Sequence, residues 1–143
     1  MGAGGSNRWF TSGISDKSLG RYVIENGQVR LIQQLDSTVS MSQPQELADF
    51  LIWARENYPS DRYMLVFWDH GGGLCSGYGQ DYINKRKDNE YGTILINEIV
   101  DAIRQSGMKF DLIGFDACLM QDAEIAMALE PYADYYLASE ETR

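Results

Sequence analysis

Two apolar stretches, each running into a chemically reactive residue, decide how this chain folds. Residues 62–73 read RYMLVFWDHGGG and residues 110–118 read FDLIGFDAC. Continuous apolar runs of this length are typical of strands that are buried on both faces of a parallel sheet. We therefore predict that each stretch begins as a buried strand, the first leading into His70 and the second into Cys118.

Helical patterns lie before, between and after these strands. Apolar residues at helical spacing predict helices over residues 42–57, 96–106 and 120–129, and a last strand is expected to start near residue 135. Ser42, followed three residues later by Gln, has the pattern of a capping box at the start of the first helix. The alternation of strands and helices predicts an α/β fold with a parallel sheet.

The remaining segments are interpreted as loops and one hairpin. Residues 1–20 are rich in Gly and Ser and predict a loop. Two short apolar runs, at residues 22–25 and 29–35, are separated by Asn26-Gly27, a dipeptide that favours a type I′ hairpin turn. Residues 75–92 are polar and without periodicity, so we expect a long exposed loop there.

Composition and charge narrow the classes of function. The 143 residues fit a single domain, 1–143, and 44% of them are hydrophobic, which is enough for a core. Lys and Arg number 12 against 21 Asp and Glu, and the net charge of −9 disfavours nucleic acid and membrane surfaces as partners. No apolar run approaches the roughly 20 residues that span a bilayer. With one His and two Cys, the sequence shows no metal-ligand spacing and too few cysteines for a disulfide scaffold.

The two strand ends predict a thiol and an imidazole at one edge of the sheet. Ligands of parallel sheets bind beyond the carboxyl ends of the strands, and a helical crossover allows the two strands to be neighbours. His70 can then face Cys118 and activate its thiol for acyl transfer. The backbone amides of Gly71 and Cys118 are candidate donors to the oxyanion. Asp116 could line an adjacent pocket that selects a basic side chain.

Plainer interpretations of the same residues stay open. A cysteine at a strand end is often a small buried apolar residue, the turn alone can explain a His before glycines, and Asp116 can cap the next helix. Cys75 lies in a Gly- and Ser-rich loop and is interpreted as a bystander. The HGGG sequence also occurs in esterases of the α/β-hydrolase fold, but the G-x-S-x-G motif that such enzymes need is absent from this sequence.

Six longer motifs follow one another along the chain: GGSNRW, IENGQVRLIQQLD, ELADFLIWARENYPSDRY, WDHGGG, FDLIGFDACLM and ALEPYADYYLASEE. Together they resemble the clostripain family of cysteine peptidases, which belongs with the caspase-like peptidases. The resemblance implies a caspase-like α/β/α sandwich with a mainly parallel sheet. Family sequences have a strand before GGSNRW and a Gly-Trp segment after SEET, so we expect a partial catalytic domain with segments missing at both ends, which a second chain could complete.

The resemblance also assigns roles to positions that match the family's motifs. It implies that His70 is the general base or acid, that Cys118 is the nucleophile, and that the amides of Gly71 and Cys118 bind the oxyanion. Asp116 matches the acidic residue that lines the S1 pocket, which implies cleavage after Arg, or Lys. Calcium is possible by resemblance alone, because no calcium-binding loop is readable in the sequence.

Self-cleavage after a basic residue matures the members of this family, often between the His and the Cys segments. Lys85, Arg86 and Lys87 lie in the loop between His70 and Cys118 and are candidate processing positions, as is Arg143 at the end of the sequence. A solvated charged turn is the plainer explanation of the three consecutive basic residues. Relatives are mostly bacterial and often exported, so the resemblance favours secretion or the cell envelope.

The leading hypothesis is a cysteine endopeptidase that cleaves after Arg or Lys through a Cys118/His70 dyad and an acyl-enzyme intermediate. Its partners would be peptides or proteins with basic residues. A non-catalytic fragment or subunit of the same fold, acting in binding or assembly, is the alternative hypothesis. An esterase built on HGGG is a third.

Overall fold

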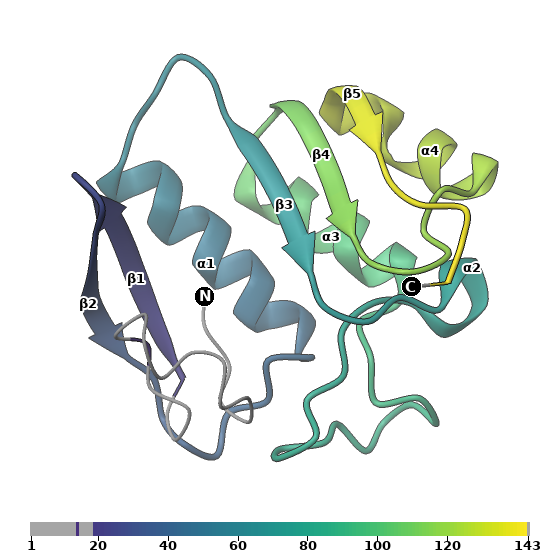
Figure 1. Ribbon diagram of the computed structural model, residues 1–143, viewed down its shortest axis with the longest axis horizontal. Coiled ribbons are helices and arrows are strands. Elements are labelled where there is room, and N and C mark those ends of the chain that lie inside the picture. Colours follow the sequence, from purple (N-terminus) through teal and green to yellow (C-terminus); the bar gives the residue numbers. More distant parts are fainter. Residues whose placement is uncertain (1–13, 15–18, 143) are drawn as a thin grey trace.

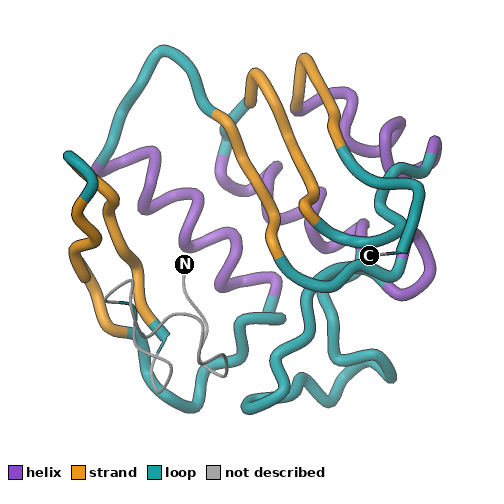
Figure 2. The backbone as a smooth tube through the Cα atoms, viewed as in Figure 1, coloured by secondary structure: helices purple, strands orange, loops and turns teal. Residues whose placement is uncertain are grey.

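A parallel sheet with helices on one side forms the centre of the molecule (Figures 1 and 2). The computed structural model describes residue 14 and residues 19–142. The sheet has three strands in the order β3-β4-β5, namely β3 (Met64–Trp68), β4 (Phe110–Asp116) and β5 (Ala133–Leu137). Both strand pairs are parallel, which confirms the predicted α/β fold.

Helices cover one face of this sheet. The helices α1 (Pro44–Asn57), α3 (Ile96–Ser106) and α4 (Ala123–Leu129) lie behind the strands in Figure 1. Isoleucines that are completely buried fill the space between the layers: Ile99, Ile103, Ile113 and Ile125. Two short elements, α2 (Gly73–Ser76) and the 3₁₀ helix η2 (Glu130–Tyr132), complete this part of the chain. No helix in the described part of the chain is both long and apolar enough to cross a bilayer.

Local sequence signals set several element boundaries. The strands β1 (Gly20–Glu25) and β2 (Gln28–Gln34) form the predicted hairpin, and its turn residues Asn26 and Gly27 have φ of 52° and 74°, as a type I′ turn requires. Gly107 ends α3 in the left-handed conformation, which glycine adopts readily. The last helix begins later than expected, because Asp122 caps it by accepting the backbone N–H of Glu124.

The start of α1 corrects one prediction. The helix begins at Pro44, and Ser42 does not cap it. Instead the buried hydroxyl of Ser42 donates to the carbonyl of Gly79 at 3.3 Å and accepts the backbone N–H of Asp81 at 2.9 Å. Ser42 therefore ties the segment before α1 to the long loop that follows β3.

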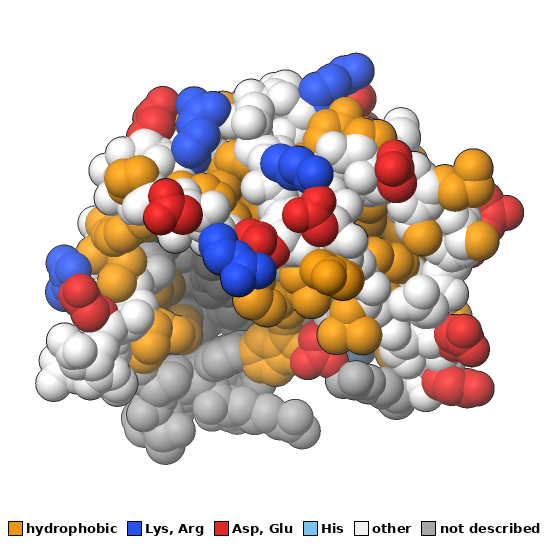
Figure 3. Space-filling view, turned by 90° about the horizontal axis from the view of Figure 1, so that it is seen from above, with side chains coloured by type: hydrophobic (Ala, Val, Ile, Leu, Met, Phe, Trp, Pro, Cys, Tyr) orange, Lys and Arg blue, Asp and Glu red, His pale blue; other side chains and the backbone are white. Residues whose placement is uncertain are grey.

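The face of the sheet away from the helices corrects a second prediction. Leu65 and Phe67 of β3 are buried toward the helices, but the alternate residues are not covered by any described part of the chain. Exposed apolar side chains on β3 and β5, each between 56% and 70% exposed, are Met64, Val66, Trp68, Tyr135 and Leu137. Figure 3 shows hydrophobic side chains exposed among charged ones at the lower centre, on the side that faces the reader in Figure 1. Of the expected sandwich, the described residues thus form the sheet and one helical layer.

Candidate active site

The carboxyl edge of the sheet brings the two predicted reactive residues to neighbouring positions. The parallel register of β3 and β4 pairs Trp68 with Asp116. His70 and Cys118 each follow two residues after that pair, so both loops leave the sheet at the same level. The predicted adjacency of the two strands is thereby confirmed, whereas the chemical roles of the two side chains stay predictions.

Gly71 is the point at which the two loops touch. A Cβ atom added to Gly71 would overlap the backbone carbonyl oxygen of Cys118 and would lie 2.8 Å from Cγ of Met120. Only a residue without a side chain allows the loop after β3 to approach the loop after β4 this closely. The sequence suggested Gly71 for its backbone amide, and the structure adds this steric reason.

The imidazole of His70 is exposed at the end of its loop. The backbone N–H of His70 donates to the Asp69 carboxylate at 2.6 Å, and its carbonyl accepts from the backbone N–H of Gly79 at 2.9 Å. The ring meets the ring of Tyr82 edge-on, with 6.4 Å between the centroids. Desolvation raises the pKa of the Asp69 carboxyl, and the hydrogen bond from His70 opposes this rise.

Cys118 lies partly buried in the short segment 117–121 after β4. The residue after it, Leu119, has φ of 58°, which places a non-glycine residue in the left-handed region. Asp116 is exposed at the last position of β4, next to the site predicted for a basic side chain. Cys75 is an exposed thiol in α2. Within the described part of the chain, neither cysteine forms a disulfide.

An aromatic cluster beneath the two loops was missed by the sequence analysis. Phe67 of β3 and Phe115 of β4 stack with centroids 4.6 Å apart, and the Tyr78 ring stands edge-on to both. Tyr136 of β5 adds a further edge contact to Phe115, at 6.1 Å. Alternation along the strands could have placed Phe67 and Phe115 on one face, but only the fold brings Tyr78 and Tyr136 to them.

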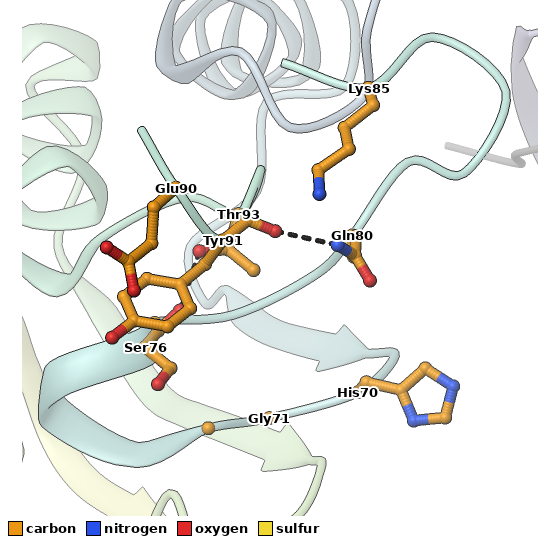
Figure 4. Close-up of a pocket in the computed structure, with 10 residues that line it drawn as sticks. His70, Gly71, Ser76, Gln80, Lys85, Glu90, Tyr91 and Thr93 are labelled. Carbon is orange, nitrogen blue, oxygen red and sulfur yellow. Dashed lines mark hydrogen bonds between the residues drawn. The ribbon is translucent and has the colours of Figure 1, made fainter. Parts of the chain in front are cut away.

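A pocket of about 290 Å³ opens beside the His70 loop (Figure 4). Figure 4 shows the His70 imidazole at one end of it, pointing away from Glu90 and Tyr91, while the Gln80 amide donates to the Tyr91 carbonyl at 2.7 Å. The residues that line the pocket are His70, Gly71, Gly72, Ser76, Gly77, Gln80, Lys85, Glu90, Tyr91 and Thr93. Of the predicted dyad, His70 lines this pocket and Cys118 does not, so the pocket lies on the His70 side of the dyad.

The long exposed loop expected over residues 75–92 is only partly exposed, and its first two residues belong to α2, which corrects a third prediction. Arg86 has 6% of its side chain exposed. Its guanidinium makes paired hydrogen bonds to the carboxylates of Asp88 and Glu98 and donates to the Thr93 carbonyl at 3.2 Å. These carboxylate bonds raise the pKa of Arg86 further above its ordinary value.

This arrangement separates the candidate processing residues. Arg86 is a buried anchor of the loop and is therefore a poor cleavage position in the folded chain, whereas Lys85 and Lys87 are exposed. Arg143 lies outside the described residues.

Metal-binding groups do not gather anywhere in the described part. Among residue 14 and residues 19–142, no cluster of three or more His, Cys, Asp or Glu side chains could hold a metal ion. The groups that the described residues place at this edge of the sheet are a thiol, an imidazole, backbone amides and a nearby carboxylate.

Comparison with known proteins places this geometry in context. Residues 12–143 match the model of the clostripain family. Clostripain from Hathewaya histolytica is 33% identical over 100 residues, which are 64% of this chain and 19% of clostripain. The chain thus spans about a fifth of the length of this relative.

Solved structures give a similar result. A secreted C11 cysteine protease from Bacteroides thetaiotaomicron, in complex with an irreversible peptide inhibitor, matches 86% of this chain and 36% of its own, with 28% identity and a TM-score of 0.68. An inactive zymogen of a C11 protease from Parabacteroides distasonis matches 88% of this chain and 35% of its own, with 27% identity and a TM-score of 0.65. Another structure of a secreted C11 cysteine protease from Bacteroides thetaiotaomicron, called iotapain, is 22% identical and shows the fold, with a TM-score of 0.67 over 88% of this chain and 39% of its own.

Proposed function

Because this chain belongs to the clostripain family, we propose that it carries the reacting side chains of a cysteine endopeptidase, with Cys118 as the nucleophile and His70 as the general acid and base. The family predicted from the motifs is confirmed, and with it the caspase-like α/β class. One observation carries the assignment of the residues: the β3/β4 register and the Gly71 contact set the two strand-end loops against each other.

The proposed reaction proceeds through an acyl-enzyme. The Cys118 thiolate attacks the carbonyl carbon of the scissile peptide bond, and a C–S bond forms while the carbonyl oxygen takes the negative charge. Backbone N–H groups of Gly71 and Cys118 stabilise that oxyanion. His70 then protonates the leaving amine as the C–N bond breaks. In the second half His70 takes a proton from water, which attacks the thioester and releases the carboxylic acid and the thiolate.

Asp116 is the proposed source of specificity. It is exposed at the end of β4, two residues before Cys118. A carboxylate at this place can form paired hydrogen bonds with the guanidinium of an arginine side chain, and a single charged bond with a lysine ammonium. We therefore propose cleavage after Arg, or Lys, in peptide and protein substrates.

Self-processing is proposed at Lys85 or Lys87. Both are exposed in the loop between His70 and Cys118, and the buried Arg86 between them would keep its contacts to Glu98 after either cut. Intact mass spectrometry after prolonged incubation would locate the cut. A single new terminus after Lys85 or Lys87, absent in Cys118→Ala, is the expected result.

Covalent trapping tests the dyad directly. The chain is incubated with an arginyl chloromethyl ketone and, in parallel, with an uncharged analogue, and its intact mass is measured. We expect one adduct with the arginyl reagent in the wild type and in Cys75→Ala, and none in Cys118→Ala or His70→Ala. Trapping needs a single attack, so it suits a chain that spans only part of its relatives. Equal labelling of Cys75 and Cys118 by both reagents would refute the proposed site.

A non-catalytic role is a second candidate, and one observation favours it. The uncovered apolar face of the sheet is typical of a surface that meets another polypeptide. A chain with this role binds an arginine-containing peptide or a protein partner without cleaving it, and its Cys118 shows no greater reactivity than Cys75. The same trapping experiment therefore separates the two candidates.

A further inference from the structure

One hydroxyl group links β5 to the segment that carries Cys118. Tyr136 of β5 donates its hydrogen bond to the backbone carbonyl of Met120, two residues after Cys118. Its ring is half-buried and stands edge-on to Phe115 of the neighbouring strand, at 72° and with 6.1 Å between the centroids. Packing against β4 thus directs the hydroxyl to one acceptor.

Tyr136 can keep this hydrogen bond over a wide pH range. Burial raises the pKa of the phenol to about 12, and the nearby charge of Asp122 adds to the rise. The hydroxyl therefore remains protonated, and remains a donor, wherever a thiol and an imidazole titrate.

Met120 connects the same segment to the loop of His70. Its side chain is completely buried, and its Cγ and Sδ atoms lie 2.8 and 3.0 Å from the position of a Cβ atom on Gly71. A displacement of the Met120 backbone would therefore move both the segment of Cys118 and the surface on which Gly71 rests. The hydroxyl of Tyr136 acts on the residue that separates the two loops.

The segment after β4 needs such external ties because its own conformation is unfavourable. Leu119 adopts a left-handed φ of 58°, which residues other than glycine rarely do. Its backbone N–H donates to the carbonyl of Glu141 at 3.3 Å, and the side-chain oxygen of Gln121 accepts the backbone N–H of Ala138 at 2.9 Å. Residues on and after β5 hold the segment in place.

We propose that Tyr136 is a positioning residue for Cys118: by holding the Met120 carbonyl, its hydroxyl fixes the thiol-bearing segment against Gly71 and so sets the relation of Cys118 to His70. The proposal rests on the proposed function, since it requires that His70 activates the thiol. Tyr136 touches neither substrate nor reacting atoms in this role.

The test compares the two cysteines of one molecule. The chain is treated with iodoacetamide from pH 5.5 to 9, and peptide mass mapping gives the alkylation rate of Cys118 relative to Cys75. The variants are Tyr136→Phe, which removes only the hydroxyl, and Tyr135→Phe, which makes the same change at the neighbouring, solvent-exposed tyrosine. Thermal melting of each variant reports whether it is folded.

A specific pattern is expected. In the wild type and in Tyr135→Phe, Cys118 reacts faster than Cys75 below pH 7, because the imidazole favours its thiolate. In Tyr136→Phe this low-pH advantage falls at least tenfold, while Cys75 keeps its rate and its pH profile. A merely structural role would loosen the segment and leave the pH profile of Cys118 unchanged in shape.

Each other outcome overturns the proposal in a recognisable way. If Tyr136→Phe keeps the wild-type ratio and profile, the positioning role is wrong and the dyad stands. If Cys118 of the wild type already titrates like Cys75, the dyad of the proposed function is wrong and the positioning role falls with it. If Tyr136→Phe does not fold, Gln121→Ala, which cuts the exposed tie of the same segment to Ala138 just after β5, decides: an unchanged Cys118 profile overturns the proposal.

Discussion

The loop after β4 and the loop after β3 leave the sheet at the same edge, yet they are anchored in different ways. The segment of Cys118 is tied to β5 and to the residues after it through both backbone and side-chain hydrogen bonds. The backbone of His70 is also fixed, by Asp69 and Gly79, but its imidazole is exposed and meets only Tyr82 among the aromatic rings described. In the proposed thiol–imidazole pair, the segment of Cys118 is thus held by the neighbouring strand, and the imidazole of His70 is placed by the long loop beside it.

The largest effect on the trapping of Cys118 is expected where the two loops meet, at Gly71. Gly71→Ala puts a methyl group into the space of the Cys118 carbonyl and the Met120 side chain, so the two loops must separate. We expect trapping of Cys118 by the arginyl reagent to fall roughly 100-fold and the free energy of unfolding to fall by about 1–3 kcal/mol. Gly27→Ala is the control for trapping only: a Cβ there has nothing within 4 Å, and the cost of placing alanine at its φ of 74° falls on the remote hairpin and not on the two loops. Undiminished trapping in Gly71→Ala would show that the loops do not need this contact.

The next effect concerns the loop that flanks His70. Arg86→Met leaves the Glu98 and Asp88 carboxylates without their buried partner, and we expect a loss of about 3 kcal/mol in the free energy of unfolding. Lys87→Met, at the adjacent exposed position, is expected to change it by less than about 0.5 kcal/mol. Urea unfolding of both variants measures the difference. Similar values for the two would mean that Arg86 does not anchor the loop.

A smaller effect is the pH dependence of the free energy of unfolding that arises from Glu98, the partner of Arg86. Burial alone raises the pKa of Glu98, but hydrogen bonds from Arg86 and from the Leu95 backbone outweigh it, and the net pKa is lowered. The stabilisation that the Glu98 carboxylate contributes is therefore complete above the pKa of an unfolded glutamate, about 4.3. It is lost as the pH falls through the lower pKa of Glu98 in the folded chain.

Glu98→Gln tests this dependence. We expect it to cost about 1–2 kcal/mol at pH 7 and to lessen the decline of stability on acidification below about pH 5. Urea midpoints at pH 7 and at acidic pH give both values, with Glu56→Gln on the surface of α1 as the control. The same decline in Glu98→Gln and in the wild type would contradict the assignment.

The smallest effect is expected at Tyr82. Its ring contact with His70 is edge-on and both side chains are exposed, so Tyr82→Ala should change the trapping rate of Cys118 by less than about threefold. A loss as large as that in Gly71→Ala would reverse the comparison, because the imidazole would then depend on the long loop as strongly as the thiol depends on β5.

Much of the fold and the location of the candidate site could be predicted from local pattern. Asn26-Gly27 and Gly107 set their turn and helix end because their backbone conformations are nearly independent of the rest of the chain. The two apolar runs predicted parallel strands, and in the observed register the carboxyl ends of these strands coincide, although one face of β3 is exposed.

The remaining features depend on contacts between distant residues. Ser42 has a capping pattern, but the loop around Gly79 and Asp81 competes for its hydroxyl. Arg86 lies among basic residues in a polar segment, and nothing local indicates that Glu98 of α3 will bury it. Tyr135 and Tyr136 are identical residues in sequence, and only their opposite directions on β5 make one exposed and the other a donor to Met120.

Trp68 gives this edge of the sheet a built-in optical signal. It is the last residue of β3, two residues before His70, and it is mostly exposed. In the register of the sheet it pairs with Asp116. Indole emission responds to local polarity and to nearby charge, so an arginine side chain that docks at Asp116 would change the fluorescence of Trp68 without any label. Occupancy of the edge could then be followed in real time, even in a Cys118→Ala chain that forms no bond to its ligand.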